Sequence, residues 1–175
     1  GRLLMLLISD ILDLSKIESN TMEFNIYTFS LNAMFADIAR MQQMNMKSGV
    51  ELIVDLPEED TEITADSARL GQVVNNLINN AVKFTPVGSI RIGYRRTGED
   101  MVELFVEDTG NGMSEEVLEH IFERFYKGKN SSGSSVGIGL ALARMIVVAQ
   151  EGTLSATNRI NGGAKFEIRF YKGTV

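Results

Sequence analysis

Residues 66–85 read DSARLGQVVNNLINNAVKFT and predict one long, largely buried helix. Asp66 is a favoured helix N-cap, and Pro86 ends the helix because a residue before proline avoids helical geometry. A helix that is apolar on most of its surface is expected inside a domain rather than on its outside. The apolar positions here are Leu70, Val73, Val74, Leu77, Ile78, Ala81 and Val82.

A polar stripe runs along this apolar helix. Gln72, Asn76 and Asn80 recur at every fourth position, and Lys83 follows on the same side. Amide side chains are costly to bury without partners, so the stripe is expected to face either a polar ligand or a buried amide network. Asparagine oxygens suit Mg²⁺, which prefers oxygen ligands, and a lysine ammonium suits phosphate.

The rest of the chain shows further strand and helix patterns. Two tight turns, at 97–100 and 161–163, join consecutive strands into hairpins. The pattern predicts an α+β fold, a two-layer sandwich in which helices cover one face of a mixed sheet, preceded by a short helix. We predict strands over 22–27, 50–55, 62–64, 89–96, 101–107, 153–158 and 165–171, and further helices over 31–46 and 137–150.

Composition narrows the possible functions. The chain has 175 residues, a formal net charge of -6 and no cysteine. The negative charge disfavours a nucleic-acid binder, and the lack of cysteine excludes disulfides and thiolate metal sites. The most apolar stretch, residues 3–14, is interrupted by Asp10 and Asp13 and is too short to span a bilayer. We therefore expect a domain that works in the cytoplasm.

The N-terminal helix has the spacing of a paired helix. Leu4, Leu7, Ile11 and Leu14 alternate at three and four residues, which is the seam of a helix pair. An amphipathic helix packed on its own domain is the alternative. The chain begins inside this pattern, so we expect a part of a longer protein, with residues 1–20 as the helix and 21–175 as the main domain.

A second candidate motif is Glu107-Asp108-Thr109-Gly110-Asn111-Gly112-Met113. A carboxylate at the end of a strand is able to accept a hydrogen bond from an exocyclic amine such as that of adenine. The two glycines allow backbone to approach a ligand closely. A tight turn without a ligand is the alternative, whereas a calcium loop is excluded because Gly110 stands where an oxygen ligand is required.

Two further motifs follow in the chain. Ile121-Phe122-Glu123-Arg124-Phe125-Tyr126-Lys127 places Phe122 and Phe125 on one side of a helical turn, where we expect both rings to be buried. Residues 128–136 are dominated by serine and glycine and are expected to be mobile without a ligand. Gly137-Ile138-Gly139-Leu140 then opens a helix, whose free N–H groups form an anion site.

Together, and in this order, these motifs resemble the N, G1, F and G2 boxes of the GHKL ATPase superfamily, and specifically those of bacterial sensor histidine kinases. Residues 76–85 are similar to an almost complete N box, and residues 7–18 to the end of the second dimerisation helix. The resemblance covers essentially the whole chain. Two departures are Ser135, where the family usually has glycine, and Gln150-Glu151, which replaces the usual His-Gly.

The resemblance implies a role for each matching residue. Asn80 and Asn76 would hold Mg²⁺, with Asn80 the more direct ligand, and Asn76, Lys83 and Lys127 would serve catalysis, the lysines by reaching the phosphates. Asp108 would read the adenine amine in a pocket shaped by Gly110, Gly112 and Phe84. Gly137, Gly139 and Leu140 would close over the phosphates of ATP.

The implied activity is transfer of the ATP γ-phosphoryl group to a histidine on a dimerisation domain, within two-component signal transduction. The only histidine, His120, is followed by Ile-Phe rather than an acidic residue, so we expect the acceptor upstream and no autophosphorylation of this fragment. The implied partners are ATP, the chain's own dimerisation domain and a response regulator. The full-length protein would be a homodimer and a candidate membrane sensor, which leaves open whether the fragment is a monomer.

Two alternatives remain. One is a GHKL ATPase of the chaperone, DNA-gyrase or mismatch-repair type, against which residues 7–18 and the Phe-x-x-Phe turn weigh. The other is a non-catalytic scaffold that binds nucleotide or only a partner. The intact Asn80, Asp108 and Lys83 argue against a scaffold.

Overall fold

A computed structural model of the chain describes residues 2–126 and 138–171. Its main feature is a five-stranded sheet in the order β2-β4-β5-β7-β6, which leaves β2 and β6 at the edges. Strands β2 and β4 are parallel, and the other neighbouring pairs are antiparallel. The strands are β2 (Val50–Asp55), β4 (Gly88–Arg96), β5 (Met101–Asp108), β6 (Thr153–Asn158) and β7 (Ala164–Tyr171).

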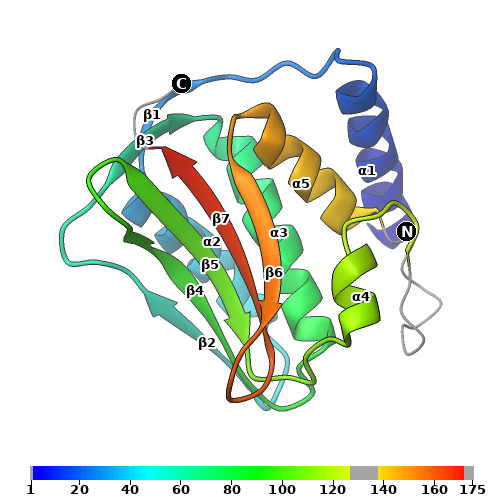
Figure 1. Cartoon of the computed structure of the whole chain (residues 1–175), viewed down its shortest axis with the longest axis vertical. Coiled ribbons are helices and arrows are strands. Elements are labelled where there is room, and N and C mark those ends of the chain that lie inside the picture. Colours follow the sequence, from blue (N-terminus) through cyan, green and yellow to red (C-terminus); the bar gives the residue numbers. More distant parts are fainter. Residues whose placement is uncertain (1, 127–137, 172–175) are drawn as a thin grey trace.

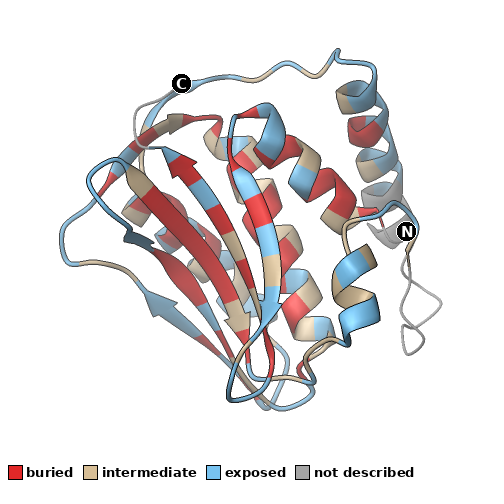
Figure 2. Cartoon of the chain, viewed as in Figure 1, coloured by how far each residue is buried: buried red, intermediate tan, exposed pale blue. Residues whose placement is uncertain are grey.

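Helices cover one face of this sheet, and Figure 2 shows the buried residues gathered between the two layers. The predicted α+β two-layer fold with a mixed sheet is therefore confirmed. The boundaries of these strands and helices lie within two residues of the predicted ones. The covering helices are α2 (Leu31–Asn45), α3 (Ser67–Lys83) and α5 (Gly139–Ala149) (Figure 1).

Helix α3 forms the centre of the helical layer, as the sequence predicts. The side chain of Asp66 caps it by accepting a hydrogen bond of 3.0 Å from the Arg69 N–H. The backbone N–H of Asp66 donates in turn to the buried Gln150 side chain at 2.7 Å. Gln150, one of the two departures from the family pattern, thus joins the end of α5 to the start of α3.

The predicted strand over 22–27 is wrong. Residues 21–26 have no regular structure, and the strand begins only at β1 (Tyr27–Ser30). It pairs antiparallel with β3 (Glu62–Ala65) in a small separate sheet. The short helix α4 (Glu115–His120), capped by Ser114, was not predicted because none of its residues is buried and it has no clear apolar stripe.

Helix α1 (Arg2–Glu18) packs beside α5 (Figure 1). Of the predicted seam, Leu14 is buried in the domain, whereas Ile11 is half exposed and the side chains of Leu4 and Leu7 lie outside the described part. Packing on its own domain therefore accounts for one side of α1. A second side stays open, with Met5, Ile8, Ile11 and Leu12 exposed. Within residues 2–126 and 138–171, no helix is long and apolar enough to cross a membrane.

Charged side chains cover the face of the sheet opposite the helices. Glu103 of β5 lies between its two cross-strand neighbours, Arg95 at 2.7 Å and Arg169 at 3.1 Å. Burial raises the pKa of Glu103, but hydrogen bonds from the two arginines outweigh burial and hold that pKa below its usual value. This face is therefore polar without leaving its central carboxylate unpaired.

Candidate functional site

The second half of α3 is joined to the first turn of α5. The Asn76 side-chain amide donates a hydrogen bond of 3.3 Å to the backbone oxygen of Gly139. Two motifs that are far apart in the sequence therefore meet, and the Asn76 side-chain oxygen remains available. A Cβ at Gly139 would lie 4.0 Å from this amide, which is an ordinary contact, so the junction does not itself require glycine.

The polar stripe on α3 divides into two parts. Gln72 belongs to a structural network, since it accepts a hydrogen bond from Arg69 and donates one to Asp13 of α1. Asn80 is different: it is half-buried, and its side chain bonds to nothing in residues 2–126 and 138–171. The alternative of a buried amide network thus applies to Gln72, while Asn80 keeps a free amide oxygen for a ligand.

Lys83 ends α3 as an exposed cation beside Phe84. Its ammonium lies 5.5 Å from the centre of the Phe84 ring, which is within the range of a cation–π contact. Because the helix rises 1.5 Å per residue, Asn76, Asn80 and Lys83 extend over roughly 10 Å along one side of α3. Such a line of amides and a cation suits an extended polyanion.

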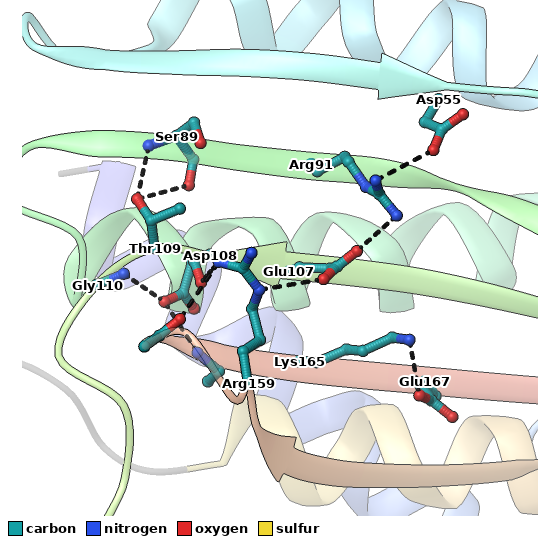
Figure 3. Close-up of polar contacts among 12 residues, drawn as sticks. Asp55, Ser89, Arg91, Glu107, Asp108, Thr109, Gly110, Arg159, Lys165 and Glu167 are labelled. Atoms are coloured by element: carbon teal, nitrogen blue, oxygen red, sulfur yellow. Dashed lines mark hydrogen bonds and ion pairs between the residues drawn. The ribbon is translucent and has the colours of Figure 1, made fainter.

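Asp108 lies at the end of β5 with a side chain that is almost fully buried. Its Oδ1 accepts hydrogen bonds from the Gly110 N–H at 2.9 Å and the Ala164 N–H at 3.2 Å (Figure 3). In the described part of the chain no residue donates a hydrogen bond of normal geometry to Oδ2, although the Thr85 hydroxyl lies near the carboxyl group, so this oxygen is left for a ligand. The carboxyl group is thus fixed in orientation with one acceptor free.

Burial is the main influence on the pKa of Asp108 and raises it above the usual value. The N–H groups of Gly110 and Ala164, the charge of Arg159 and the Thr85 hydroxyl act in the opposite direction without outweighing it. Figure 3 shows Arg159 reaching from the β6–β7 turn to Glu107 and to the backbone oxygen of Asp108, at 3.2 Å and 3.1 Å. Asp108 is therefore a strongly held carboxylate in a poorly solvated place, as functional carboxylates often are.

Glycines bring backbone close to this carboxylate. A Cβ at Gly110 would lie 2.2 Å from the backbone oxygen of Phe84, which also accepts a hydrogen bond from the Asn111 N–H. Gly112 has a φ of 71°, and a Cβ there would lie 3.2 Å from Asn158. Asp108, Gly110 and Phe84 therefore come together as expected, with Gly112 on the outer side of the same loop.

The start of α5 leaves its first N–H groups without a side-chain cap. Ile138 occupies the N-cap position, where its apolar side chain cannot accept a hydrogen bond, and Gly139 and Leu140 follow at the positive end of the helix. The predicted anion site at this helix start stays a prediction. Lys127, Gly137 and the segment expected to be mobile, 128–136, lie outside the described residues.

The Phe-x-x-Phe prediction is half wrong. Phe122 packs edge-on against Phe166, with ring centres 6.2 Å apart, but Phe125 is 60% exposed and has a φ of 62°. The left-handed backbone at Phe125 interrupts the helical turn that would have placed both rings together. His120 lies on the surface as predicted, where a hydrogen bond to Glu123 raises its pKa.

Sequence reasoning did not identify several residues around Asp108. Arg159, Gly163 and Ala164 reach it from the β6–β7 hairpin, and Thr85 from the end of α3. The Asn-Gly-Gly turn was recognised, but nothing in the sequence shows that it would lie against β5. In the described part of the chain no cluster of three or more His, Asp or Glu side chains forms a metal site.

Comparison with known proteins agrees with this architecture. Residues 65–174 match the family model described as histidine kinase-, DNA gyrase B-, and HSP90-like ATPase. The aerobic respiration control sensor protein ArcB of Escherichia coli (strain K12) is 30% identical over 176 residues, which is 95% of this chain and 22% of ArcB. Full-length ShkA superposes with a TM-score of 0.86 at 24% identity, over 98% of this chain and 36% of ShkA. The catalytic domain of the histidine kinase ThkA has a TM-score of 0.75 at 26% identity, over 86% of this chain and 99% of that domain.

The chain therefore belongs to the histidine kinase-, DNA gyrase B- and HSP90-like ATPase family. Within that family it is an ATPase domain of the histidine-kinase type, homologous to the catalytic domains of two-component sensor kinases, which act in signal transduction. This assignment removes the alternative of a chaperone- or gyrase-type enzyme.

Proposed function

We propose that this domain binds ATP and transfers its γ-phosphoryl group to a histidine of a dimerisation domain. The observation that carries the proposal is Asp108, a buried carboxylate with one oxygen fixed by two N–H groups and the other left for a donor. The amino group of adenine is such a donor. ShkA, whose fold this chain shares, was solved in complex with the ATP analogue AMPPNP, which supports the proposal that this domain binds a nucleotide.

The proposed adenine pocket has Asp108 at its base, Phe84 at its side and the loop with Gly110 and Gly112 as its wall. The phosphates would then run along α3 toward the first turn of α5. There the charge of the phosphates would be offset by Lys83, by the N–H groups of Gly139 and Leu140 at the start of α5, and by Lys127 and Gly137 beyond the described residues. In this proposal the nucleotide extends from Asp108 at its adenine end along the polar groups of α3 at its phosphate end.

The residues on α3 fit a magnesium ion. The Asn80 amide oxygen has no partner among the described residues, and the Asn76 oxygen lies one turn away. Both are ligands that Mg²⁺ accepts beside water and phosphate oxygens. Bound there, the ion would neutralise negative charge on the transferring phosphoryl group. Asn80 would act as the closer ligand, while Asn76 also keeps the start of α5 in place.

Residues 1–20 would be the end of a dimerisation helix and 21–175 the catalytic domain. The exposed Ile8, Ile11 and Leu12 support a helix partner in a homodimer of the whole protein. The phosphoacceptor would be a histidine of that dimerisation domain rather than His120, whose exposed side chain is hydrogen-bonded to Glu123. A response regulator would receive the phosphoryl group next, in the cytoplasm, whether or not the whole protein is a membrane sensor.

Nucleotide binding is the first test. Calorimetry with Mg²⁺ should show tighter binding of ATP than of ITP, which carries an oxygen in place of the adenine amino group. Asp108→Asn should weaken ATP binding by about 1.5–3 kcal/mol, the scale of a hydrogen bond to a charged group, and leave ITP binding little changed. Equal affinity of the unmodified chain for ATP and ITP would remove the role proposed for Asp108.

Phosphoryl transfer is the second test. Labelled ATP should leave no acid-labile phosphate on the chain alone, and should label a separately supplied dimerisation domain of its own parent, slowly because the tether is absent. Asn80→Ala should abolish the transfer and His120→Ala should leave it intact. Label on His120 would contradict the proposal, and ATP binding without any labelled acceptor would favour the scaffold alternative.

A further inference from the structure

In the described part of the chain, Thr85 Oγ1 is the only buried side-chain nitrogen or oxygen without a hydrogen bond of normal geometry. The residue is completely inaccessible, and its Oγ1 makes no hydrogen bond of normal geometry with any described residue, although the hydroxyl is close enough to the Asp108 carboxyl group to lower its pKa. Buried hydroxyl groups are nearly always paired, so an unpaired one at the end of α3 requires an explanation. Its position beside the proposed adenine pocket suggests that explanation.

The hydroxyl is directed toward the loop that carries the site carboxylate. A Cβ at Gly110 would lie 2.8 Å from Thr85 Oγ1, so the hydroxyl lies over a position that only glycine leaves open. The N–H of the same glycine donates to Asp108 Oδ1 at 2.9 Å. The Thr85 hydroxyl and the Asp108 carboxylate therefore both lie next to Gly110. A hydroxyl is able to donate a hydrogen bond to a carboxylate.

We propose that Thr85 is a positioning residue of the nucleotide site, whose hydroxyl donates to the Asp108 carboxylate when ATP binds. This inference rests on the proposed function. Adenine over Asp108 removes the remaining water from a carboxylate that is already almost fully buried, which makes one more donor valuable at that moment. The new hydrogen bond holds the free oxygen toward the adenine amino group, and the cost of the unpaired hydroxyl disappears in the bound state.

The structure also separates this role from simple packing. The Thr85 methyl group faces Gly88, where a Cβ would lie 3.6 Å from it. Thr85→Val keeps a methyl at this position and removes only the hydroxyl. Thr85→Ser keeps the hydroxyl and removes the methyl. The pair of variants therefore distinguishes the hydrogen bond from the packing contact.

Calorimetry with Mg²⁺ and either ATP or ITP tests the proposal on the whole 175-residue chain. Thr85→Val should bind ATP about tenfold more weakly, the effect of losing one hydrogen bond to a charged group, and should bind ITP like the unmodified chain. Thr85→Ser should stay within about threefold of the unmodified chain for ATP. Thr85→Val should also unfold at the same or a higher temperature, because an unpaired buried hydroxyl has been removed.

A pH series gives a second readout. Arg159 is the charged group that acts on Asp108 together with the Gly110 and Ala164 N–H groups, and Thr85→Val leaves all three in place. The loss of ATP binding on acidification should therefore begin at a higher pH in Thr85→Val than in the unmodified chain. Unchanged ATP affinity in Thr85→Val, or equal weakening of ATP and ITP, would overturn the proposal. Failure of the proposed function looks different, because the unmodified chain itself would then not prefer ATP to ITP.

Discussion

The Asp13 carboxylate of α1 and the Arg69 guanidinium of α3 form an ion pair of 3.1 Å. The Gln72 amide donates to the same carboxylate at 3.0 Å, so α1 is held by the first half of the helix whose second half carries Asn76 and Asn80. Both charged side chains are largely buried, which makes the pair less screened than a surface ion pair. The contact between α1 and the rest of the domain is thus polar and specific as well as apolar.

Removing the Asp13 carboxylate should loosen α1 without harming the nucleotide site. Asp13→Asn leaves Arg69 without its negatively charged partner, and we expect local opening of α1 to become easier by about 1–3 kcal/mol. Hydrogen exchange should show faster exchange in residues 8–18 and unchanged exchange in β5 and β7. Ser15→Ala, an exposed change on the same helix, is the control. Unchanged protection in Asp13→Asn would mean that apolar contacts alone hold α1.

ATP binding should depend on pH through Asp108. Since burial raises the pKa of Asp108, the carboxylate becomes protonated at a higher pH than an ordinary aspartate does. A protonated Oδ2 no longer accepts from the adenine amine, so ATP affinity should fall as the pH drops through this raised pKa. Calorimetry between roughly pH 4 and 8, a range that begins near the usual carboxyl pKa, would measure the ATP affinity as a function of pH. The ATP affinity of Asp108→Asn should depend less on pH. An identical pH dependence in both proteins would contradict the role proposed for Asp108.

Gly163 should be among the least replaceable residues of the site. Its φ is 87°, and a Cβ would lie 1.9 Å from the backbone oxygen of Asp108. Gly163→Ala should cost about 3 kcal/mol or more of unfolding free energy, because backbone must move. Gly162 has a φ of 101°, and a Cβ there would meet open space. Gly162→Ala should therefore lower the unfolding free energy by only about 1–2 kcal/mol, because alanine disfavours a left-handed backbone.

The opposite result is expected at Gly71, in the interior of α3. Nothing lies within 4 Å of a Cβ there, and alanine favours a helix over glycine by about 1 kcal/mol. Gly71→Ala should therefore raise the unfolding free energy, as measured by urea denaturation. A loss of stability would mean that the glycine serves a contact in another state of the protein.

Glu103 should contribute stability that depends on pH. In the folded state its pKa lies below the usual value, so the contribution is present above the unfolded pKa and is lost as the pH falls through the folded pKa. Glu103→Gln should destabilise the domain by about 1–3 kcal/mol at pH 7, because Arg95 and Arg169 lose their shared partner. The difference from the unmodified chain should shrink below about pH 4.5 in urea denaturation series, and a constant difference would indicate a packing effect.

The sequence predicts those parts of the fold that depend on local pattern. Helix α3 and the hairpin of β6 and β7 follow from apolar periodicity, a capping aspartate and a glycine turn, and their boundaries are nearly correct. Gln72 shows the limit, because a spacing of four residues does not reveal that Asp13 will lie against it. Arg159 and Phe125 show the same limit, since the first acts across strands and the second depends on one left-handed backbone angle.

The edge strand β2 has a consequence for how molecules of this domain meet in solution. An exposed edge is a template on which a second sheet can grow, and long apolar edges lead to aggregation. Here Glu51 and Asp55 stand on the same side of a strand of six residues. In an antiparallel pairing of two copies centred on Ile53, each Glu51 would face the Asp55 of the other molecule, and like charges directly opposite are unfavourable. The domain can therefore be present at high local concentration, as two catalytic domains of one dimer would be, without joining sheet to sheet through β2.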